Sequence, residues 1–209
     1  MIQMTFSSCL TNADRGIVLD ASVIINLLAT KKADEILMAL DMKVTTPDVV
    51  AREISRGAEN GREEFDGLRG LIDKRVIEVK ELGVQTLEVF FDLVSGGTAK
   101  SLGDGEAATL ALSEGNNFVA AIDEKKATQR ASEAFSSLKM ATTIDLLSYV
   151  SVKNLLSKDE LSQSVLLALR NARMQVWDHQ FQWVLDLVGI GNARECPTLR
   201  RHLRARKIY

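Results

Sequence analysis

The sequence has few of the residues from which disulfide frameworks, zinc sites and histidine-based catalysis are built. Its only cysteines, Cys9 and Cys196, stand near opposite ends of the 209-residue chain. They form neither a disulfide framework nor a zinc-knuckle spacing, which favours free thiols in a reducing cytoplasm. The two histidines, His179 and His202, both come late in the chain. Acid–base catalysis by histidine is therefore not expected.

Several motifs and segments that would define other functions are also missing. The chain contains no HExxH, no CxxC, no Walker-type glycine loop and no G-x-S-x-G elbow. Zinc hydrolysis and P-loop chemistry therefore have no support in the sequence. The first residues lack a basic start followed by an apolar run, so we expect no signal peptide. No uncharged apolar stretch reaches about 18 residues, so we expect no transmembrane helix and no membrane partner.

The overall charge is nearly balanced, with a formal net charge of −2 and a pI of about 5.8. Such a molecule is not a polycation that coats nucleic acid without specificity. A nuclease remains compatible with this balance, because its own acidic residues lower the pI. The last residues are the exception, since they carry Arg200, Arg201, Arg204, Arg206 and Lys207. This basic tail either steers RNA toward the protein or is simply a solvated end.

Short apolar runs alternate with helical patterns along the first 150 residues. Strands are predicted at residues 17–19, 43–46, 76–82, 118–122 and 140–144. Helices are predicted after Ser22 and at residues 47–57, 60–73, 84–94, 105–115 and 125–135. Strands that alternate with helices imply right-handed crossovers and a parallel sheet that is covered on both faces. The sequence therefore predicts a three-layer α/β/α sandwich with a central, mostly parallel sheet.

Three residues are predicted to mark helix ends in this region. Ser22 is expected to cap the first helix, and Pro47 is expected in the first turn of the second. Gly57 is a candidate C-cap for that second helix. Ser95, Gly96 and Gly97 predict a break after the helix at 84–94.

The last part of the chain is predicted to be a helical extension. We expect one domain over residues 14–150 and a helical C-terminal extension with the basic tail over residues 151–209. Apolar residues recur in the extension at helical spacing: Leu161, Val165, Leu169, Val176, Trp177, Phe181, Val184 and Val188. They form either additional core or a dimer surface, or they line a groove for a partner protein.

Two aspartates follow predicted strands that are far apart in the sequence. Asp20 ends the first strand, and Asp123 ends the strand at 118–122. Ligands of open parallel sheets bind outside the carboxyl ends of the strands. Aspartate is also common in turns and caps, so the pair alone leaves structural and functional roles equally open.

Two further acids could converge on this pair. Glu53 lies on the helix after the second strand, and Glu106 lies at the start of the Gly-Asp-Gly-Glu helix. Glu53 could instead be a solvated helix residue, Glu106 could favour a helix N-terminus, and Asp104 is expected to be a cap. Hard divalent cations prefer oxygen ligands and keep several waters, so a few carboxylates suffice to hold one. Such an ion orients a water and offsets the charge of the acids and of a phosphate.

Four blocks of the sequence, in order, resemble the PIN domains, the fold of VapC-type toxin ribonucleases. The blocks are IVLDASVIINL, TTPDVVAREI, LGDGEAATLALSEG and NNFVAAIDEKKATQRA. The resemblance runs from about Ile17 to Leu147. The Gly-Glu-Ala version of the third block is similar to a PIN subfamily in which glutamate stands where many members have aspartate.

The resemblance implies a metal-dependent endoribonuclease that uses Mg²⁺ or Mn²⁺. It implies that Asp20, Glu53, Glu106 and Asp123 are the catalytic and metal-binding residues. It further implies that Ser22 supports the first acid and that Arg130 could meet a phosphate, although Arg130 could equally be a surface cation.

The resemblance also implies partners. An RNA substrate, an antitoxin protein and a homodimer are expected, and the chain is then plausibly the toxin of a type II toxin–antitoxin pair. Two other functions stay open: a PIN nuclease of RNA processing or DNA maintenance without an antitoxin, and a PIN-like binding module without catalysis.

Overall fold

The protein is described by a computed structural model over residues 6–59, 64–95 and 101–208. Its contacts divide the chain into two compact units. The sheet unit contains Thr11–Ile25 and Asp41–Thr142, and the helical unit contains Met1–Leu10, Asn26–Leu40 and Thr143–Tyr209. Helix α1 (Ala21–Ala29) begins in the first unit and ends in the second. The units join segments that are distant in the sequence, so the boundary near residue 150 stays a prediction.

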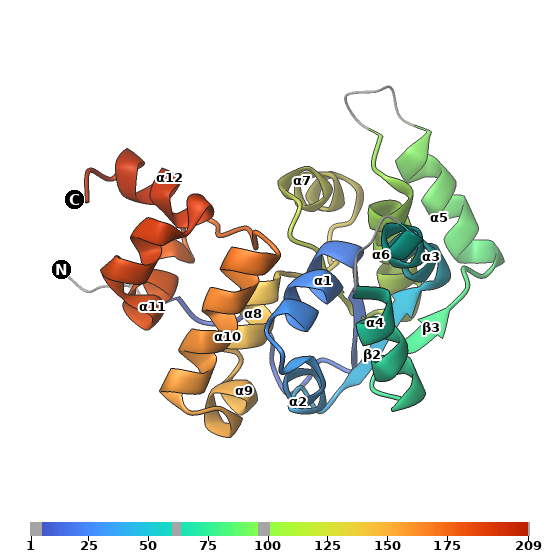
Figure 1. Cartoon of the computed structure of the whole chain (residues 1–209). Coiled ribbons are helices and arrows are strands. Elements are labelled where there is room, and N and C mark those ends of the chain that lie inside the picture. The colour runs from blue at the N-terminus through green and yellow to red at the C-terminus, as the bar shows by residue number, and fades with distance from the viewer. Residues whose placement is uncertain (1–5, 60–63, 96–100, 209) are drawn as a thin grey trace. The chain divides into compact units, whose positions relative to one another are not determined.

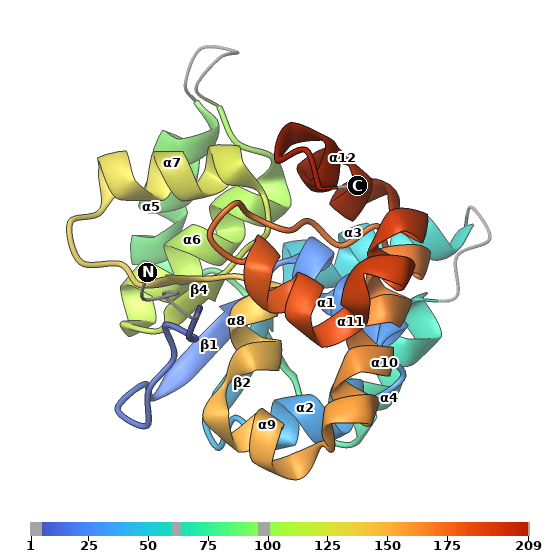
Figure 2. The ribbon, with the colours of Figure 1, turned by 90° about the vertical axis from the view of Figure 1, so that its left-hand side faces the viewer.

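The sheet unit is built on a five-stranded sheet in the order β3-β2-β1-β4-β5. Its strands are β1 (Gly16–Leu19), β2 (Lys43–Pro47), β3 (Glu78–Lys80), β4 (Val119–Ala121) and β5 (Met140–Ala141). All described pairings are parallel, and Figure 2 shows β1, β2 and β4 side by side. Helices flank this sheet, which confirms the predicted α/β/α fold class.

The order of the strands reverses between β1 and β4. From β1 the chain adds β2 and then β3 on one side, and it returns to add β4 and β5 on the other side. In open α/β sheets, this reversal leaves a crevice outside the carboxyl ends of the two central strands, where ligands bind. The fold therefore places the residues after β1 and β4 at its natural binding position.

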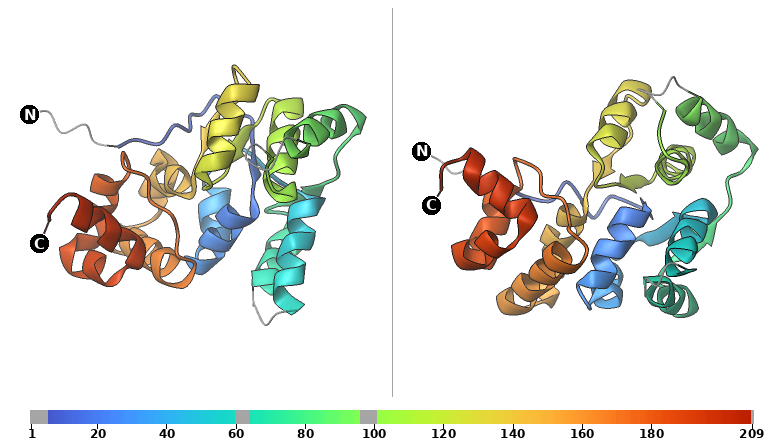
Figure 3. Two further views of the ribbon diagram at one scale, coloured as in Figure 1. Left: turned by 90° about the horizontal axis from the view of Figure 1, so that it is seen from above. Right: turned by 45° about the horizontal axis from the view of Figure 1, so that its top comes forward.

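Among the described residues, the helices that lie wholly in the sheet unit are α3 (Asp48–Glu59), α4 (Glu64–Asp73), α5 (Val84–Val94), α6 (Asp104–Asn116) and α7 (Lys125–Ala134). Helix α6 contacts α5, α3 and the strands β1, β2 and β4 (Figures 1 and 3). Ala107, Ala108 and Ala111 are fully buried on α6. Their small side chains let this helix approach the sheet closely, so residues at its start come near the strand ends.

The helical unit holds α2 (Ala33–Met38), α8 (Thr143–Ser148), α9 (Val150–Leu155), α10 (Lys158–Asn171), α11 (Phe181–Glu195) and α12 (Pro197–Ala205). Helix α11 packs against α10 and α12, the orange and red helices of Figure 3. It is kinked at Gly189, whose φ of 79° is strained for other residues. The apolar residues predicted at helical spacing are buried here except Trp177, which is half-buried, so they form core.

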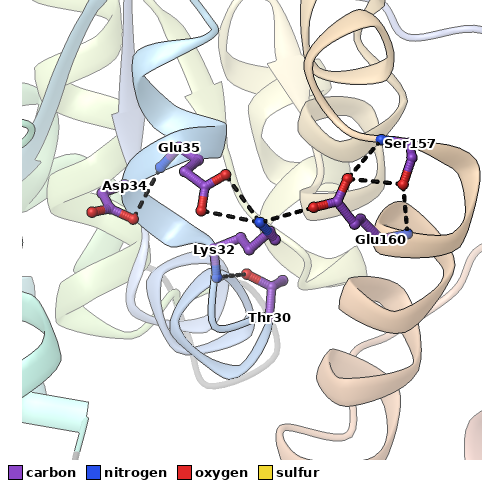
Figure 4. A network of polar contacts seen from close by, with 6 residues as sticks. All are labelled: Thr30, Lys32, Asp34, Glu35, Ser157 and Glu160. Atoms are coloured by element: carbon purple, nitrogen blue, oxygen red, sulfur yellow. Dashed lines mark hydrogen bonds and ion pairs between the residues drawn. The ribbon is translucent and has the colours of Figure 1, made fainter.

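A polar network joins the starts of α2 and α10 within the helical unit (Figure 4). Lys32 Nζ lies 3.0 Å from Glu35 Oε2 and 3.3 Å from Glu160 Oε1. Glu160 also accepts from the backbone N–H and the hydroxyl of Ser157, and its own backbone N–H donates to Ser157 Oγ at 3.3 Å. This capping box satisfies N–H groups at the start of α10, which makes it more valuable than the exposed ion pairs.

Several predicted element ends were wrong, such as that at Pro47, which pairs with Lys80 of β3 and so belongs to the sheet. Ser22 lies inside α1, and Pro47 is the last residue of β2, not the first turn of α3. Helix α3 continues through Gly57 to Glu59. The last strand ends at Ala141, so Ile144 belongs to α8. Residues 60–63, where a helix start was predicted, and Gly96 and Gly97 of the predicted break lie outside the described residues.

Within the described part of the chain, no helix is long and apolar enough to cross a membrane.

Replacing Ser157 by alanine removes the hydroxyl that caps α10 and should destabilise the protein. Loss of a serine N-cap costs about 1 kcal/mol, which lowers Tm by roughly 2–4 °C in a protein of this size. Thermal unfolding followed by circular dichroism measures the change. The matched control is Ser157→Asp, which keeps a capping oxygen and should unfold near the wild-type temperature. A Tm for Ser157→Ala equal to the wild type would show that the box contributes nothing.

Candidate active site

The two aspartates predicted at strand ends follow neighbouring strands of the sheet. Strands β1 and β4 are parallel, with Leu19 paired to Ala121. Asp20 comes directly after β1 and Asp123 comes two residues after β4. Both are buried, at 5% and 4% exposure. The register therefore places both residues at the carboxyl ends of adjacent strands, at the position where the strand order reverses.

Asp20 is held in place by the first turn of α1. Its Oδ2 accepts from the hydroxyl of Ser22 at 2.7 Å and from the backbone N–H of Ser22 at 3.2 Å. These bonds lower the pKa of Asp20, but burial raises it by more, and Glu124 adds to the rise. Ser22, which was expected to support the first acid, is thus its hydrogen-bond partner, while its role in a functional site stays a prediction. Asp20 is thus a buried acid whose negative charge is not fully compensated by its neighbours.

Glu53 reaches the same place from α3, and Gly105 on α6 leaves room for it. A Cβ atom built on Gly105 would lie 2.7 Å from Glu53 Oε2 and 3.5 Å from Asp20 Oδ1. The two carboxylates therefore border one small space beside the start of α6. Glu53 as a whole is exposed, yet desolvation of its carboxyl is the main cause that raises its pKa, followed by Asp20 and Asp104.

Glu106 has both a structural and an electrostatic role. Its Oε2 accepts from the backbone N–H of Gly103, the N-cap residue of α6, at 3.1 Å. Burial raises the pKa of Glu106, the bond to Gly103 lowers it, and the charges of Asp20 and Glu124 raise it again. Glu106 therefore binds the N-cap residue at the start of α6, and the charge of Asp20 also raises its pKa.

Two further acids belong to this electrostatic group. Glu124 raises the pKa of both Asp20 and Glu106; the sequence reasoning did not name it, although its place beside Asp123 was an available signal. Asp104 was expected to be a cap, but Gly103 occupies that position and Asp104 is the first residue of α6. Instead, its charge raises the pKa of Glu53.

The cations near the acids offset only part of this charge. Arg56 lowers the pKa of Glu53, and Lys126 lowers that of Glu106, but in each case this effect is smaller than those of burial and of repulsion by other acids. Lys126 Nζ is also bonded to the carbonyl of Ser101 at 2.7 Å. Arg130 pairs with Glu133 at 3.1 Å, and its buried Nε has no hydrogen-bond partner. A phosphate contact for Arg130 stays a prediction.

The donor chemistry of this group fits a hard divalent cation. Within the described ranges, no group of three or more histidine, cysteine, aspartate or glutamate side chains is arranged to hold a metal ion. Mg²⁺ nevertheless keeps several waters and is usually held by one or two protein carboxylates. Asp20 and Glu53, each of which has a carboxylate oxygen beside Gly105, meet that smaller requirement. A cation there would offset the repulsion that raises their pKa values.

The sequence between residues 16 and 189 matches a family model described as a PIN domain. This match covers most of the chain and both acidic strand ends. The chain belongs to the PIN-domain family. PIN domains are generally nucleases, which are hydrolases, and they typically use divalent metals. No curated protein matches the chain.

In this PIN domain, Gly105→Ala should separate the function of the site from its stability. The added Cβ meets the end of the flexible Glu53 side chain, so Glu53 must move away from Asp20 while the fold is kept. Alanine is also the better helix former by up to about 1 kcal/mol. We expect the free energy of unfolding to be unchanged or higher, and the Mn²⁺ affinity measured by calorimetry to fall about 10-fold.

The matched control for this variant is Gly70→Ala on α4, where an added Cβ meets nothing within 4 Å. It should gain stability in the same way without any change in Mn²⁺ affinity. If Gly105→Ala binds Mn²⁺ as well as Gly70→Ala does, Glu53 and Asp20 do not share an ion.

The raised pKa of Asp20 predicts how stability depends on pH. Because the folded protein binds this proton more tightly than the unfolded chain, stability is lost as pH rises above the unfolded value near 3.8. Glu53 and Glu106 act in the same direction. At pH 7 in EDTA, Asp20→Asn should therefore unfold at a higher temperature than the wild type.

Adding Mn²⁺ should reverse that order by stabilising the wild type and leaving Asp20→Asn unchanged. Differential scanning calorimetry in EDTA and in Mn²⁺ measures both effects. A less stable Asp20→Asn in EDTA, together with a wild type that does not respond to Mn²⁺, would contradict this account of the site.

Proposed function

We propose that this PIN domain is a metal-dependent endoribonuclease that hydrolyses RNA phosphodiester bonds with Mg²⁺ or Mn²⁺. The observation that carries the proposal is the convergence of Asp20 and Glu53 beside Gly105 at the strand-order reversal. Asp20, Glu53, Glu106 and Asp123 are the proposed catalytic and metal-binding residues. Ser22, Asp104 and Arg130 support them.

Each side chain has a defined task in this proposal. Ser22 binds Oδ2 of Asp20, which leaves Oδ1 on the side that borders Gly105 and Glu53. Glu53 and Asp20 present oxygen atoms toward the same space, and Glu106 is kept near by its bond to Gly103. The burial of Asp20 and Asp123 excludes water from the inner side of the site.

A divalent ion held by these acids would lower the pKa of a bound water and would offset negative charge on the phosphoryl oxygens. The overall reaction adds water across the P–O3′ bond, which leaves a 5′-phosphate on one fragment and a 3′-hydroxyl on the other.

The biological role that we propose follows from the resemblance to VapC-type toxins. We infer a VapC-type protein of the Gly-Glu-Ala subfamily, acting in the cytoplasm as a homodimer and as the toxin of a type II pair with a protein antitoxin. The four blocks that carry the resemblance support this role. A nuclease of RNA processing or DNA maintenance would share the site but would have no antitoxin. A binding module without catalysis is disfavoured by the retention of all four acids.

The decisive test compares cleavage by the wild type, Asp20→Asn and Asp123→Asn. Each protein is incubated with a mixed RNA pool and with DNA of the same sequences, in Mn²⁺, Mg²⁺ or EDTA. We expect metal-dependent cleavage of RNA and at least a 100-fold loss in both variants, since even outer-shell partners of a metal cost about 10–100-fold.

Asp66→Asn is the matched control, because Asp66 is an exposed acid on α4 in the same unit. It should cleave like the wild type. A folded wild type that cleaves no RNA in either metal, or site variants that cleave as well as Asp66→Asn, would contradict the proposal. Cleavage of DNA in preference to RNA would keep the nuclease and overturn its substrate.

A further inference from the structure

Helix α12 presents an outward face of arginines. Leu199, His202 and Leu203 are its buried residues. Arg200, Arg201 and Arg204 are exposed, and none of these three makes an ion pair with a carboxylate of the described residues. The exposed face therefore carries positive charge that the protein itself leaves uncompensated.

The charge balance changes sharply in this part of the chain. Residues 170–209 contain eight lysines and arginines against three acids, whereas the whole molecule has a net charge of −2. Two of those three acids are already paired, Asp178 with Arg206 and Glu195 with Arg170. A local positive field in an otherwise acidic protein indicates an anionic ligand for this surface.

Aromatic side chains lie beside this helix. Trp177 and His179 stand in the segment before α11, with ring centroids 5.9 Å apart, and the His179 ring lies 5.6 Å from Phe6. Phe6 in turn lies 6.2 Å from Trp183. His179 is exposed, and the other three rings are half-buried. Part of this aromatic cluster (Phe6, Trp177, His179 and Trp183) is therefore open to solvent.

The aromatic cluster and α12 are joined by direct contacts. Arg206, just after α12, donates to the carbonyl of Asp178 at 3.2 Å and to its carboxylate at 3.1 Å. Asp178 stands between Trp177 and His179 in the sequence. His202 stacks on Phe181 at 5.1 Å, and its Nε2 is bonded to the carbonyl of Val176 at 2.8 Å. These contacts fix the aromatic segment against the basic helix.

We propose that α12 and the adjoining aromatic cluster form a binding surface for single-stranded RNA, distinct from the acidic site. Proteins that bind single strands combine a basic track for the phosphates with aromatic rings on which bases stack. Both parts are present and are joined through Arg206. This inference rests on the proposed function for its choice of RNA, because the same chemistry accepts single-stranded DNA.

The burial of the apolar side of α12 favours a nucleic acid over an acidic lipid surface. A membrane-binding helix carries apolar side chains next to its cations, whereas the apolar residues Leu199 and Leu203 of α12 are buried in the helical unit. The exposed part of the surface therefore offers guanidinium groups and partly exposed aromatic rings, which suit phosphates and bases.

The surface can be tested with the full-length protein and a fluorescein-labelled 15-nucleotide oligouridylate in EDTA, which prevents hydrolysis. Fluorescence anisotropy gives Kd at several salt concentrations. The triple variant Arg200→Gln/Arg201→Gln/Arg204→Gln should bind at least about 10-fold more weakly. Its plot of log K against log salt should be shallower by about 2, since each phosphate contact to a single strand contributes roughly 0.7.

The matched control removes the same charge elsewhere, through Arg69→Gln/Lys153→Gln/Lys158→Gln, all of which are exposed. It should bind with the wild-type salt slope. His179→Ala should weaken binding by about 5-fold or more, the loss expected for one stacked base. Trp177 and Trp183 are the only tryptophans of the chain, so oligouridylate should also quench the intrinsic fluorescence.

Equal binding by the two triple variants, or the absence of quenching, would overturn the surface. A second outcome would also overturn it, in favour of a membrane surface. In that outcome the wild type sediments with phosphatidylserine vesicles but does not bind RNA, and the α12 variant no longer sediments with the vesicles. An outcome that contradicts the proposed nuclease activity can be told apart from one that contradicts this surface. Salt-dependent binding that only the α12 variant weakens, without any cleavage in Mn²⁺, would support the surface and contradict the proposed function.

Discussion

The burial of Asp20 among other carboxylates is the constraint on which the sheet unit depends. This acid lies at 5% exposure directly after the central strand, with its pKa raised by burial. Two bonds from Ser22 compensate only part of its charge. Glu53, Glu106 and Glu124 add repulsion instead of relief. A structure organised only for stability would not place acids in this way, because an uncompensated buried charge costs free energy. A divalent cation would relieve this cost, and PIN domains typically use divalent metals.

The approach of α6 to the strand ends allows that group to form. Its alanines permit close packing on the sheet, and Gly105 leaves the volume in which the carboxylates of Glu53 and Asp20 meet. In the same turn, the carboxylate of Glu106 accepts from the backbone N–H of Gly103. The residues at the start of α6 therefore have two roles: Glu106 binds the N-cap residue of the helix, and Gly105 leaves space for the two carboxylates.

The charges of the protein are divided between its two compact units. Acids gather at the sheet edge, while uncompensated arginines gather on α12 of the helical unit. Each unit has its own core, and the helical unit is further secured by the capping box of α10 and by the stacking of His202 on Phe181. In the nuclease proposed above, the acidic residues would repel the phosphate backbone of RNA, so a basic surface on other residues is a physically reasonable means to hold it.

The sequence by itself determined the parallel sheet, the α/β/α class and the placement of Asp20 and Asp123 after buried strands. Those features follow from local patterns, because a buried strand and the acid that ends it are encoded by a few consecutive residues. Helix ends were less well predicted, as Ser22, Pro47 and Gly57 show, since neighbouring packing shifts them by a residue or more. Only the tertiary structure decided that Gly105 would lie between two carboxylates, that Glu124 would act on Asp20, and that Arg206 would join α12 to the aromatic segment. These relations join residues that are far apart in the chain, and no local pattern records distances that arise only when the elements pack.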